Sequence, residues 1–309
     1  MAVKIIEATD AIEISQIRML IFGQPGIGKS SLGNTAEEPL SLDFDKGAHR
    51  AQNRKRTVSI DAWEDVQELM RMEDFLRRHK TIVLDTVGRC LDVMSVAIIS
   101  ENSKFGYAGN LSQQGWGVLK GRFRTWMAQL ATLGIDVVML AHDKEDKSGD
   151  VKNIRPDIQG GSYGEVLKVA DFVGYYCMAG KDRTLDFSPT EQYVGKNPAG
   201  WQPFKVPSII KAPKFLAALM VEGRQALGKL SEESAAIASK VAEWQAEIDG
   251  FATVEQINES LPKIKTLAPP ILLEQVKFHL VNKAKALNLK ADKKSGLFVA
   301  AEEPQAQTA

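Results

Sequence analysis

The chain has few of the side chains that build disulfide frameworks or zinc sites. Its 309 residues include two cysteines, Cys90 and Cys177, four histidines and no Cys-x-x-Cys pair. Such sparse and separated cysteines indicate a reducing compartment, and we expect both thiols to be buried and inert. Disulfide-stapled scaffolds and zinc-dependent folds are therefore not expected.

The chain also lacks an excess of one charge and any long apolar run. It has 39 lysine plus arginine and 39 aspartate plus glutamate residues, so a site for a polyanion would have to be a local patch. No run approaches the roughly 18 apolar residues of a membrane span, and the first residues lack a basic segment before an apolar stretch. We expect a cytoplasmic protein that does not bind membranes.

What the chain does contain is a glycine-rich loop directly after a short apolar run. Residues 18–22 read Arg-Met-Leu-Ile-Phe, and Gly-Gln-Pro-Gly-Ile-Gly-Lys-Ser follows. In this spacing the glycines let backbone N–H groups turn toward phosphates, the lysine neutralises β- and γ-phosphate oxygens, and the serine hydroxyl ligates Mg²⁺. The pattern predicts a nucleotide-binding loop made of Gly23, Gln24, Pro25, Gly26, Ile27, Gly28, Lys29, Ser30 and Ser31.

Short β-rich runs alternate with helical patterns from Met19 to about Val206. This alternation is typical of an α/β fold in which a mainly parallel sheet is flanked by helices. A helix is expected after Asp61 as its N-cap, and 184–187 with 192–194 should form an antiparallel hairpin at the sheet edge. The expected strands are 19–22, 40–43, 57–60, 81–85, 136–141 and 171–177.

After about Leu227 only helical periodicity remains. Ser231 is a candidate N-cap for a helix over 232–248, Thr253 forms a candidate capping box for the next helix, and Pro269-Pro270 opens a third. The expected organisation is an N-terminal segment over 1–17, a nucleotide-binding core over 18–226, a small C-terminal helical region over 227–299, and a disordered tail over 300–309.

Polar residues at the ends of three expected strands complete a candidate hydrolytic site. Asp85 follows an apolar run, where P-loop proteins hold the hydration shell of Mg²⁺, so Ser30 and Asp85 are the expected magnesium ligands. Asp45 is the candidate that orients or deprotonates water, with Asp43 on the same strand face as a close alternative. His142 ends another apolar run and could sense the γ-phosphate, although a lone histidine could equally be structural.

The identity of the nucleotide is predicted partly by an absence. Asp85-Thr-Val-Gly88 matches the Asp-x-x-Gly element of GTPases, but the guanine-reading Asn/Thr-Lys-x-Asp element does not follow the next strand. ATP with Mg²⁺ is therefore the expected ligand.

These residues together resemble the RecA-like P-loop family, and more closely the phage nucleotide-binding proteins that consist of a RecA-type core and act in single-strand annealing. The resemblance covers about residues 18–205. It rests on short sequence segments that occur in the same order: the P-loop, Leu42-Asp-Phe-Asp-Lys-Gly47, Val58-Ser-Ile-Asp-Ala-Trp63, Thr81-Ile-Val-Leu-Asp-Thr-Val87, Ala141-His142 and Ala170-Asp-Phe-Val173. In that family the residue matching Asp45 is usually glutamate, and an amide often stands where His142 does.

The resemblance implies a RecA-like core that uses or is gated by ATP and assembles as a ring or filament on single-stranded DNA. It implies strand annealing or pairing in the cytoplasm of a phage-infected bacterium, with a single-strand-binding protein as a candidate partner. Lys181 and Arg183 are candidates for a cation that reaches the γ-phosphate on a neighbouring subunit. The cationic run 49–56 could contact a neighbour's nucleotide or the DNA backbone, although charge runs are usually solvated surface.

Two loops would carry DNA under this interpretation. Residues 102–116 combine glycines, amides and aromatic faces suited to stacking, and 144–163 follow the strand of His142 with several cations. Glycine-rich surface loops with solvated charges are a common alternative. The expected DNA contacts are Lys104, Tyr107, Trp116, Lys120, Lys147, Lys152 and Arg155.

Three functions remain open at this point. The favoured one is an ATPase that binds single-stranded DNA and promotes strand pairing in recombination. The alternatives are an ATPase that loads or remodels a replication partner, and a nucleotide-gated structural subunit that barely hydrolyses ATP. A metabolic kinase is the least supported function, because the sequence contains no recognisable site for a phosphate acceptor.

Overall fold

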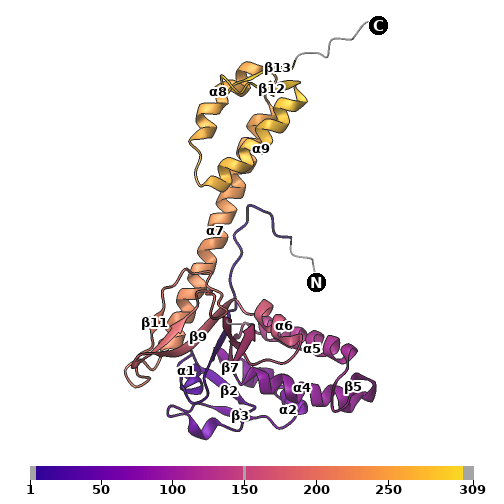
Figure 1. The fold of residues 1–309 in the computed structure, drawn as a ribbon, viewed down its shortest axis with the longest axis vertical. Helices are drawn as coiled ribbons and strands as arrows, with labels where there is room; N and C mark the ends of the chain where they lie inside the picture. The colour runs from indigo at the N-terminus through magenta and orange to yellow at the C-terminus, as the bar shows by residue number, and fades with distance from the viewer. Residues whose placement is uncertain (1–4, 149–150, 302–309) are drawn as a thin grey trace. The chain divides into compact units, whose positions relative to one another are not determined.

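The computed structural model describes residues 5–148 and 151–301, and only the backbone of 147, 148, 151 and 152 (Figure 1). Contacts within the chain divide it into two compact units. One unit is Ile14–Leu227, and the other joins the N-terminal residues up to Glu13 with those from Gly228 onward.

The larger unit is built on one sheet, which has nine strands among the described residues. Their order is β11-β10-β9-β1-β7-β4-β2-β3, and β8 pairs with β7 outside this path. Pairing is parallel from β9 through β1, β7, β4 and β2 to β3, which confirms the mainly parallel sheet and all six expected strands. The strands are β1 (Arg18–Gly23), β2 (Pro39–Asp43), β3 (Thr57–Ser59), β4 (Thr81–Asp85), β7 (Asp136–Ser148), β8 (Val151–Pro156), β9 (Phe172–Ala179), β10 (Asp182–Asp186) and β11 (Phe204–Lys205).

Helices cover both faces of this sheet. Alternate strand residues point to opposite sides, so the apolar strands present side chains on both faces that the helices bury. Leu20 and Phe22 of β1 pack in the core beneath α2, α4, α5 and α6, whereas Met19 and Ile21 pack beneath α1 and the first turns of α7. The fold is therefore the expected α/β arrangement. The helical elements are α1 (Lys29–Gly33), η1 (Ala48–Arg50), α2 (Trp63–Arg71), α3 (Glu73–Leu76), α4 (Val87–Glu101), η2 (Ser103–Phe105), α5 (Gln113–Thr132), α6 (Ser162–Val169) and α7 (Phe215–Asp249).

The central strand β7 begins at a buried carboxylate that joins three segments. Asp136 accepts the backbone N–H of Ile17 at 2.8 Å, and Arg224 donates to its two oxygens at 2.7 and 2.6 Å. Charge-assisted hydrogen bonds to a carboxylate with little solvent around it are among the stronger polar contacts in proteins. This cluster therefore fixes α7 to the start of the central strand.

Replacing Arg224 with alanine should lower the free energy of unfolding by about 1.5–3 kcal/mol, because Asp136 would lose its charged partner while remaining buried. The measurement is urea denaturation followed by circular dichroism. Arg77→Ala is the matched control, since its exposed pair with Glu73, at 3.4 Å, should contribute no more than about 0.5 kcal/mol. Equal losses in the two variants would contradict the structural role of the Asp136 cluster.

The hairpin expected over 184–187 and 192–194 is wrong. A tight turn at Gly180, where φ is 63°, pairs β10 with β9 instead, and the other edge of β10 pairs with β11. Tyr193 makes only an isolated parallel bridge with Ile154. Because β9 and β11 occupy both edges of β10, the segment after Ser188-Pro189 has no free edge of β10 with which it could pair.

Asp61 does not cap α2 as expected. The helix starts at Trp63, and the Asp65 carboxylate accepts the N–H groups of Asp61 and Ala62 at 2.7 and 2.9 Å. The Asp61 side chain instead pairs with Lys46 at 2.6 Å. A carboxylate inside the first turn thus satisfies the free N–H groups before the helix.

The smaller unit contains the last part of α7 together with α8 (Val254–Lys265), α9 (Pro270–Ala286) and an antiparallel pair, β12 (Leu289–Ala291) and β13 (Phe298–Ala300). The capping box at Thr253 is confirmed: the Gln256 N–H donates to its hydroxyl at 3.4 Å, and the Gln256 side chain accepts from the Thr253 N–H at 3.1 Å. The start of α9 at Pro270 is also as expected.

Two expectations for this unit are wrong. Ser231 caps no helix, because α7 continues through it and its hydroxyl accepts the Ile12 N–H at 2.6 Å. The region is also not purely helical, since β12 and β13 are strands too short to show an alternating pattern. Most of the expected disordered tail, 302–309, and the first residues, 1–4, lie outside the described residues.

The two cysteines differ in exposure. Cys90 lies on the buried face of α4, and burial raises the pKa of its thiol, whereas Cys177 is only partly buried. The expectation of a buried thiol therefore holds fully for Cys90 and in part for Cys177. Among the helices of the described residues, none has the length and apolar content that crossing a bilayer requires.

Candidate nucleotide site

Parallel pairing brings the ends of β1, β2 and β4 to one edge of the sheet, beside His142 within β7. Gly23 at the end of β1 lies beside His142 of β7, and Asp43 at the end of β2 lies beside Asp85 at the end of β4. Ligand sites of open parallel sheets form at this edge because the loops that leave the strands converge there. The parallel pairing of these strands therefore brings most of the candidate site residues together.

The glycine-rich loop leads into α1, which packs closely on the sheet. A β-carbon at Gly33 would lie 2.9 Å from Val83 Cγ1 and 3.3 Å from Leu140 Cδ1, so only glycine allows this approach. Val83 and Leu140 belong to β4 and β7, the strands that carry Asp85 and His142. The loop therefore has a fixed position relative to both polar residues.

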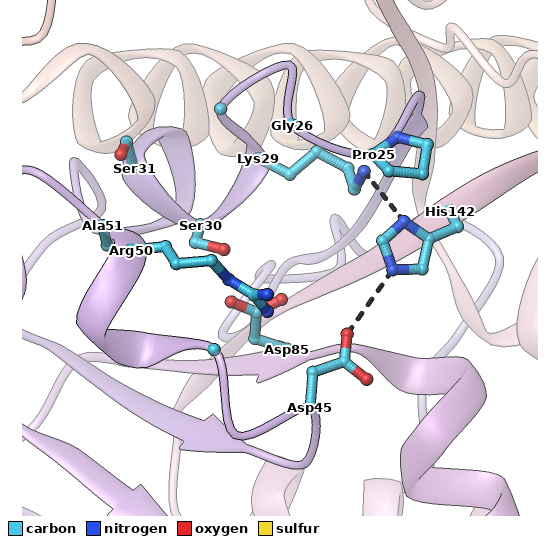
Figure 2. A pocket seen from close by; sticks show the side chains of 12 residues that line it. Pro25, Gly26, Lys29, Ser30, Ser31, Asp45, Arg50, Ala51, Asp85 and His142 are labelled. Carbon is cyan, nitrogen blue, oxygen red and sulfur yellow. Dashed lines mark hydrogen bonds and ion pairs between the residues drawn. The ribbon is translucent and has the colours of Figure 1, made fainter.

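A cavity of about 450 Å³ opens above this edge of the sheet (Figure 2). Its volume lies within the range of small-molecule sites. All four side chains predicted to act on the nucleotide line it, together with most of the P-loop. The lining residues are Pro25, Gly26, Gly28, Lys29, Ser30, Ser31, Asp45, Gly47, Arg50, Ala51, Asp85 and His142.

The Lys29 ammonium group is held by its own loop. It donates to the carbonyl oxygens of Gly23 and Gln24 at 2.7 and 2.8 Å, and its Nζ lies 3.3 Å from His142 Nδ1. Burial lowers its pKa to about 8, although nearby carboxylates, Asp143 first among them, partly offset the effect. A polyphosphate would restore the charged form of this lysine.

This lowered pKa predicts that ATP affinity falls as the pH rises. Below the free-state pKa of about 8 the lysine is already charged, and above it binding must take up a proton, because phosphate raises the pKa. We expect the Kd for ATP to increase about tenfold between about pH 7 and about pH 9. Calorimetry at the higher pH in buffers of different ionisation enthalpy should show proton uptake on binding, and its absence would contradict the assignment.

Asp45 is positioned by His142, by Arg89 and by the backbone of Asp85. Its carboxylate lies 3.5 Å from His142 Nε2 and 3.6 Å from Arg89 Nε, and its N–H donates to the Asp85 carbonyl at 3.3 Å. The hydrogen bond from His142, followed by the charge of that ring and of Arg89, holds the pKa of Asp45 below its usual range. An ionised Asp45 can accept a hydrogen bond from water throughout the neutral pH range.

The contacts of His142 fix its tautomer when the ring is neutral. Nε2 faces the Asp45 carboxylate, which can only accept, and Nδ1 faces the Lys29 ammonium, which can only donate. The proton therefore sits on Nε2. His142 links the P-loop lysine to Asp45 (Figure 2), a connection that sequence position alone did not reveal.

Asp85 and Ser30 have the chemistry expected of magnesium ligands. Burial raises the pKa of Asp85, and a hydrogen bond from the Ser30 hydroxyl opposes this rise. A hydroxyl beside a buried carboxylate suits Mg²⁺, which takes oxygen ligands and keeps several waters when bound with a nucleotide. The residues present thus fit a Mg–nucleotide complex.

Hydrogen bonding gives Asp43 and Asp45 different environments. Asp43 is 5% exposed and accepts the N–H groups of Gly47 and Ala48 at 3.0 and 2.9 Å, whereas Asp45 lines the cavity. Asp43 therefore shapes the turn into η1. The strand ends between the two acids, so the expected shared face does not persist.

The first loop proposed to carry DNA is largely ordered structure. It contains η2, a short hairpin of β5 (Gly106–Tyr107) and β6 (Asn110–Leu111), and the start of α5. Tyr107 is 78% exposed at the hairpin and Lys104 is exposed. Trp116 and Lys120 lie on α5 against Gly160 and Gly161, so neither is a free surface side chain.

The second loop is a β-ribbon, which corrects the expectation of a loop over 144–163. β7 extends to Ser148 and pairs with β8 from Val151. Arg155 pairs with Asp146 and lies over the Tyr163 ring, 5.1 Å from its centroid. The side chains of Lys147 and Lys152 lie outside the described residues.

Arg183 contacts the P-loop of its own chain, whereas the prediction had it reach a neighbouring subunit. Its Nε donates to the Ile27 carbonyl at 2.8 Å. Lys181 is exposed at the turn between β9 and β10. Sequence reasoning missed this internal contact because it depends on the β9–β10 pairing.

Comparison with known proteins gives one family match. A family described as AAA domain matches residues 15–199, more than half of the chain. Curated proteins offer no match. Among solved structures, a KaiC-like protein from the hyperthermophilic archaeon Pyrococcus horikoshii is similar, with 11% identity over 55% of this chain and 76% of that chain and a TM-score of 0.35.

Proposed function

We propose, from the premise that this chain belongs to the AAA domain family, that it binds ATP with Mg²⁺ and hydrolyses the nucleotide. We propose further that it uses this cycle to bind single-stranded DNA and promote strand pairing. The observation that carries the ATPase proposal is the linked set Lys29, His142 and Asp45 at one cavity. A site that only stored nucleotide would not need a carboxylate held ionised in this position.

The geometry supports a simple division of labour during hydrolysis. Lys29 exchanges its two carbonyl partners for phosphate oxygens and neutralises their charge, and Ser30 and Asp85 hold the magnesium ion, which would polarise the phosphates. Asp45 accepts a hydrogen bond from the attacking water and orients it. The water oxygen bonds to the γ-phosphorus, the bond to the β-phosphate oxygen breaks, and ADP leaves together with phosphate, which carries the proton lost by the water.

The DNA part of the proposal is supported by how β7 continues beyond the site. His142 contacts Lys29, and the same strand runs on without interruption to Ser148 as one half of the ribbon. A change at His142 when the γ-phosphate binds or leaves would act on the base of this ribbon. The exposed Tyr107 offers a face on which a base could stack.

The test is ATP turnover with and without single-stranded DNA, with Lys29→Ala and Asp85→Ala as site controls. We expect DNA to stimulate turnover, both controls to lose it, and Tyr107→Ala to reduce only the stimulation. Annealing of labelled complementary oligonucleotides should then require ATP binding. An ATP turnover rate that does not change when DNA is added would overturn this proposal and favour an ATPase that loads or remodels a protein partner.

Assembly into a ring or filament on DNA, and contact with a single-strand-binding protein, belong to the same proposal. Sedimentation with ATP and an oligonucleotide should show several copies per DNA molecule. A protein that stays monomeric under these conditions would remove the assembly from the proposal.

A further inference from the structure

Arg50 differs from the other cations around the cavity. Its side chain is directed into the cavity from the end of η1, on the other side from Lys29 in the view of Figure 2. Within the part of the chain that the structure describes, its guanidinium has no hydrogen-bond or ion-pair partner. Lys29 and Arg183, by contrast, are bound to carbonyls of the P-loop, and Arg89 is bound to carboxylates.

The segment that carries Arg50 is anchored on both sides. Before it, the buried Asp43 carboxylate holds the N–H groups of Gly47 and Ala48. After it, the Asn53 side-chain amide donates to the carbonyl of Ser31 in α1 at 3.0 Å. These bonds hold η1 beside the P-loop, and from this position the exposed Arg50 side chain lines the cavity.

Gly47 provides the surface on which the guanidinium lies. A β-carbon there would overlap Nη2 of Arg50 and lie 3.1 Å from its Cζ. The φ of Gly47 is −104°, a value that alanine adopts without strain. The glycine is therefore needed for the position of Arg50 and not for the path of the backbone.

We propose that Arg50 is a phosphate-binding cation, supplied by the same chain as the P-loop, that contacts the polyphosphate of the bound nucleotide from the side opposite Lys29. This inference rests on the proposed ATP site. A guanidinium is satisfied by anions, and the two acids that line the cavity already serve other groups: Asp45 is paired with His142 and Arg89, and Asp85 with Ser30. A phosphate group supplies the missing oxygens, and Arg50 therefore acts within its own subunit.

The first experiment is equilibrium binding of Mg–ATP to the full chain, comparing wild type with Arg50→Ala, Arg50→Lys, Arg54→Ala and Lys29→Ala. Loss of one or two charge-assisted hydrogen bonds should weaken binding about tenfold to hundredfold in Arg50→Ala. Arg50→Lys should recover part of this loss, since it keeps the charge without the planar fork. Arg50 and Arg54 are both exposed, but Arg54 does not line the cavity, so Arg54→Ala removes an equal charge and should bind within about twofold of wild type.

The second experiment moves Arg50 without removing it. Gly47→Ala should displace the guanidinium and weaken ATP binding nearly as much as Arg50→Ala. The double variant should show no further loss, because residues that act through one contact are not additive. Additive losses would show that Gly47 and Arg50 act separately and would overturn the proposed geometry.

The outcomes separate this inference from the proposed function. If Lys29→Ala loses binding while Arg50→Ala and Arg54→Ala both match wild type, the nucleotide site stands and the role of Arg50 is overturned. If wild type binds no ATP, or Lys29→Ala binds as well as wild type, the proposed nucleotide site itself fails and the inference fails with it.

Discussion

Lys29→Ala should abolish measurable ATP turnover and weaken ATP binding by at least about a hundredfold. In the free protein this ammonium bonds to two loop carbonyls and approaches His142, so it is already placed at the phosphate site. The partly desolvated position that lowers its pKa also strengthens its attraction for phosphate oxygens. Nucleotide binding by calorimetry and phosphate release by a coupled assay measure the two effects.

The variant must be shown to be folded before its loss of activity is interpreted. Alanine replaces a buried charge at the edge of a cavity, so a cooperative thermal transition should persist. A folded Lys29→Ala protein that still hydrolyses ATP near the wild-type rate would contradict the assignment of the P-loop.

Asp45→Asn should lower kcat about a hundredfold to ten-thousandfold while leaving ATP affinity nearly unchanged, because orientation and activation of water are lost but phosphate contacts are kept. Asparagine retains an oxygen that can accept from His142, so the main change is the loss of charge. The low pKa of Asp45 means that wild-type activity should not depend on its titration near neutral pH. Single-turnover measurements separate the chemical step from binding and release.

Asp45→Glu provides the complementary test. Glutamate is the residue usual at this position in the RecA-like proteins that the sequence resembles, and its longer side chain should keep measurable turnover. If Asp45→Asn hydrolyses ATP as fast as wild type, Asp45 does not orient the water, and a nucleotide-gated subunit with slow turnover becomes the better description.

The sequence predicted those features of the site that depend on short segments. The P-loop and Asp85 each follow an apolar strand, and parallel strands bring such ends together whatever the rest of the chain does. The same reasoning placed His142 at the cavity. It could not show that the ring joins Lys29 to Asp45, because this depends on side-chain direction.

Features set by contacts between distant segments were missed. The sequence favours Asp45 over Asp43 only narrowly, because it does not show that the N–H groups of Gly47 and Ala48 donate to the Asp43 carboxylate. Arg183 reaches Ile27 only because β10 folds back on β9.

The ribbon was missed for a different reason. The end of β7 is rich in charged residues, from Asp143 to Lys147, so it shows no alternation of apolar and polar side chains and reads as a loop. A two-stranded ribbon outside the path of the main sheet needs no buried face, and its sequence therefore carries little strand signal.

The close packing at Gly33 gives the site one rigid wall and one adjustable wall. Because α1 touches Val83 and Leu140, any change in the depth of the P-loop must move β4 and β7, and with them Asp85 and His142. The wall that carries Asp45 and Arg50 follows the buried Phe44 and is held mainly by polar contacts, among them the hydrogen bonds at Asp43 and Asn53. Variation in nucleotide preference between related chains should therefore arise in residues 45–53, where a substitution can reshape the cavity without disturbing the sheet.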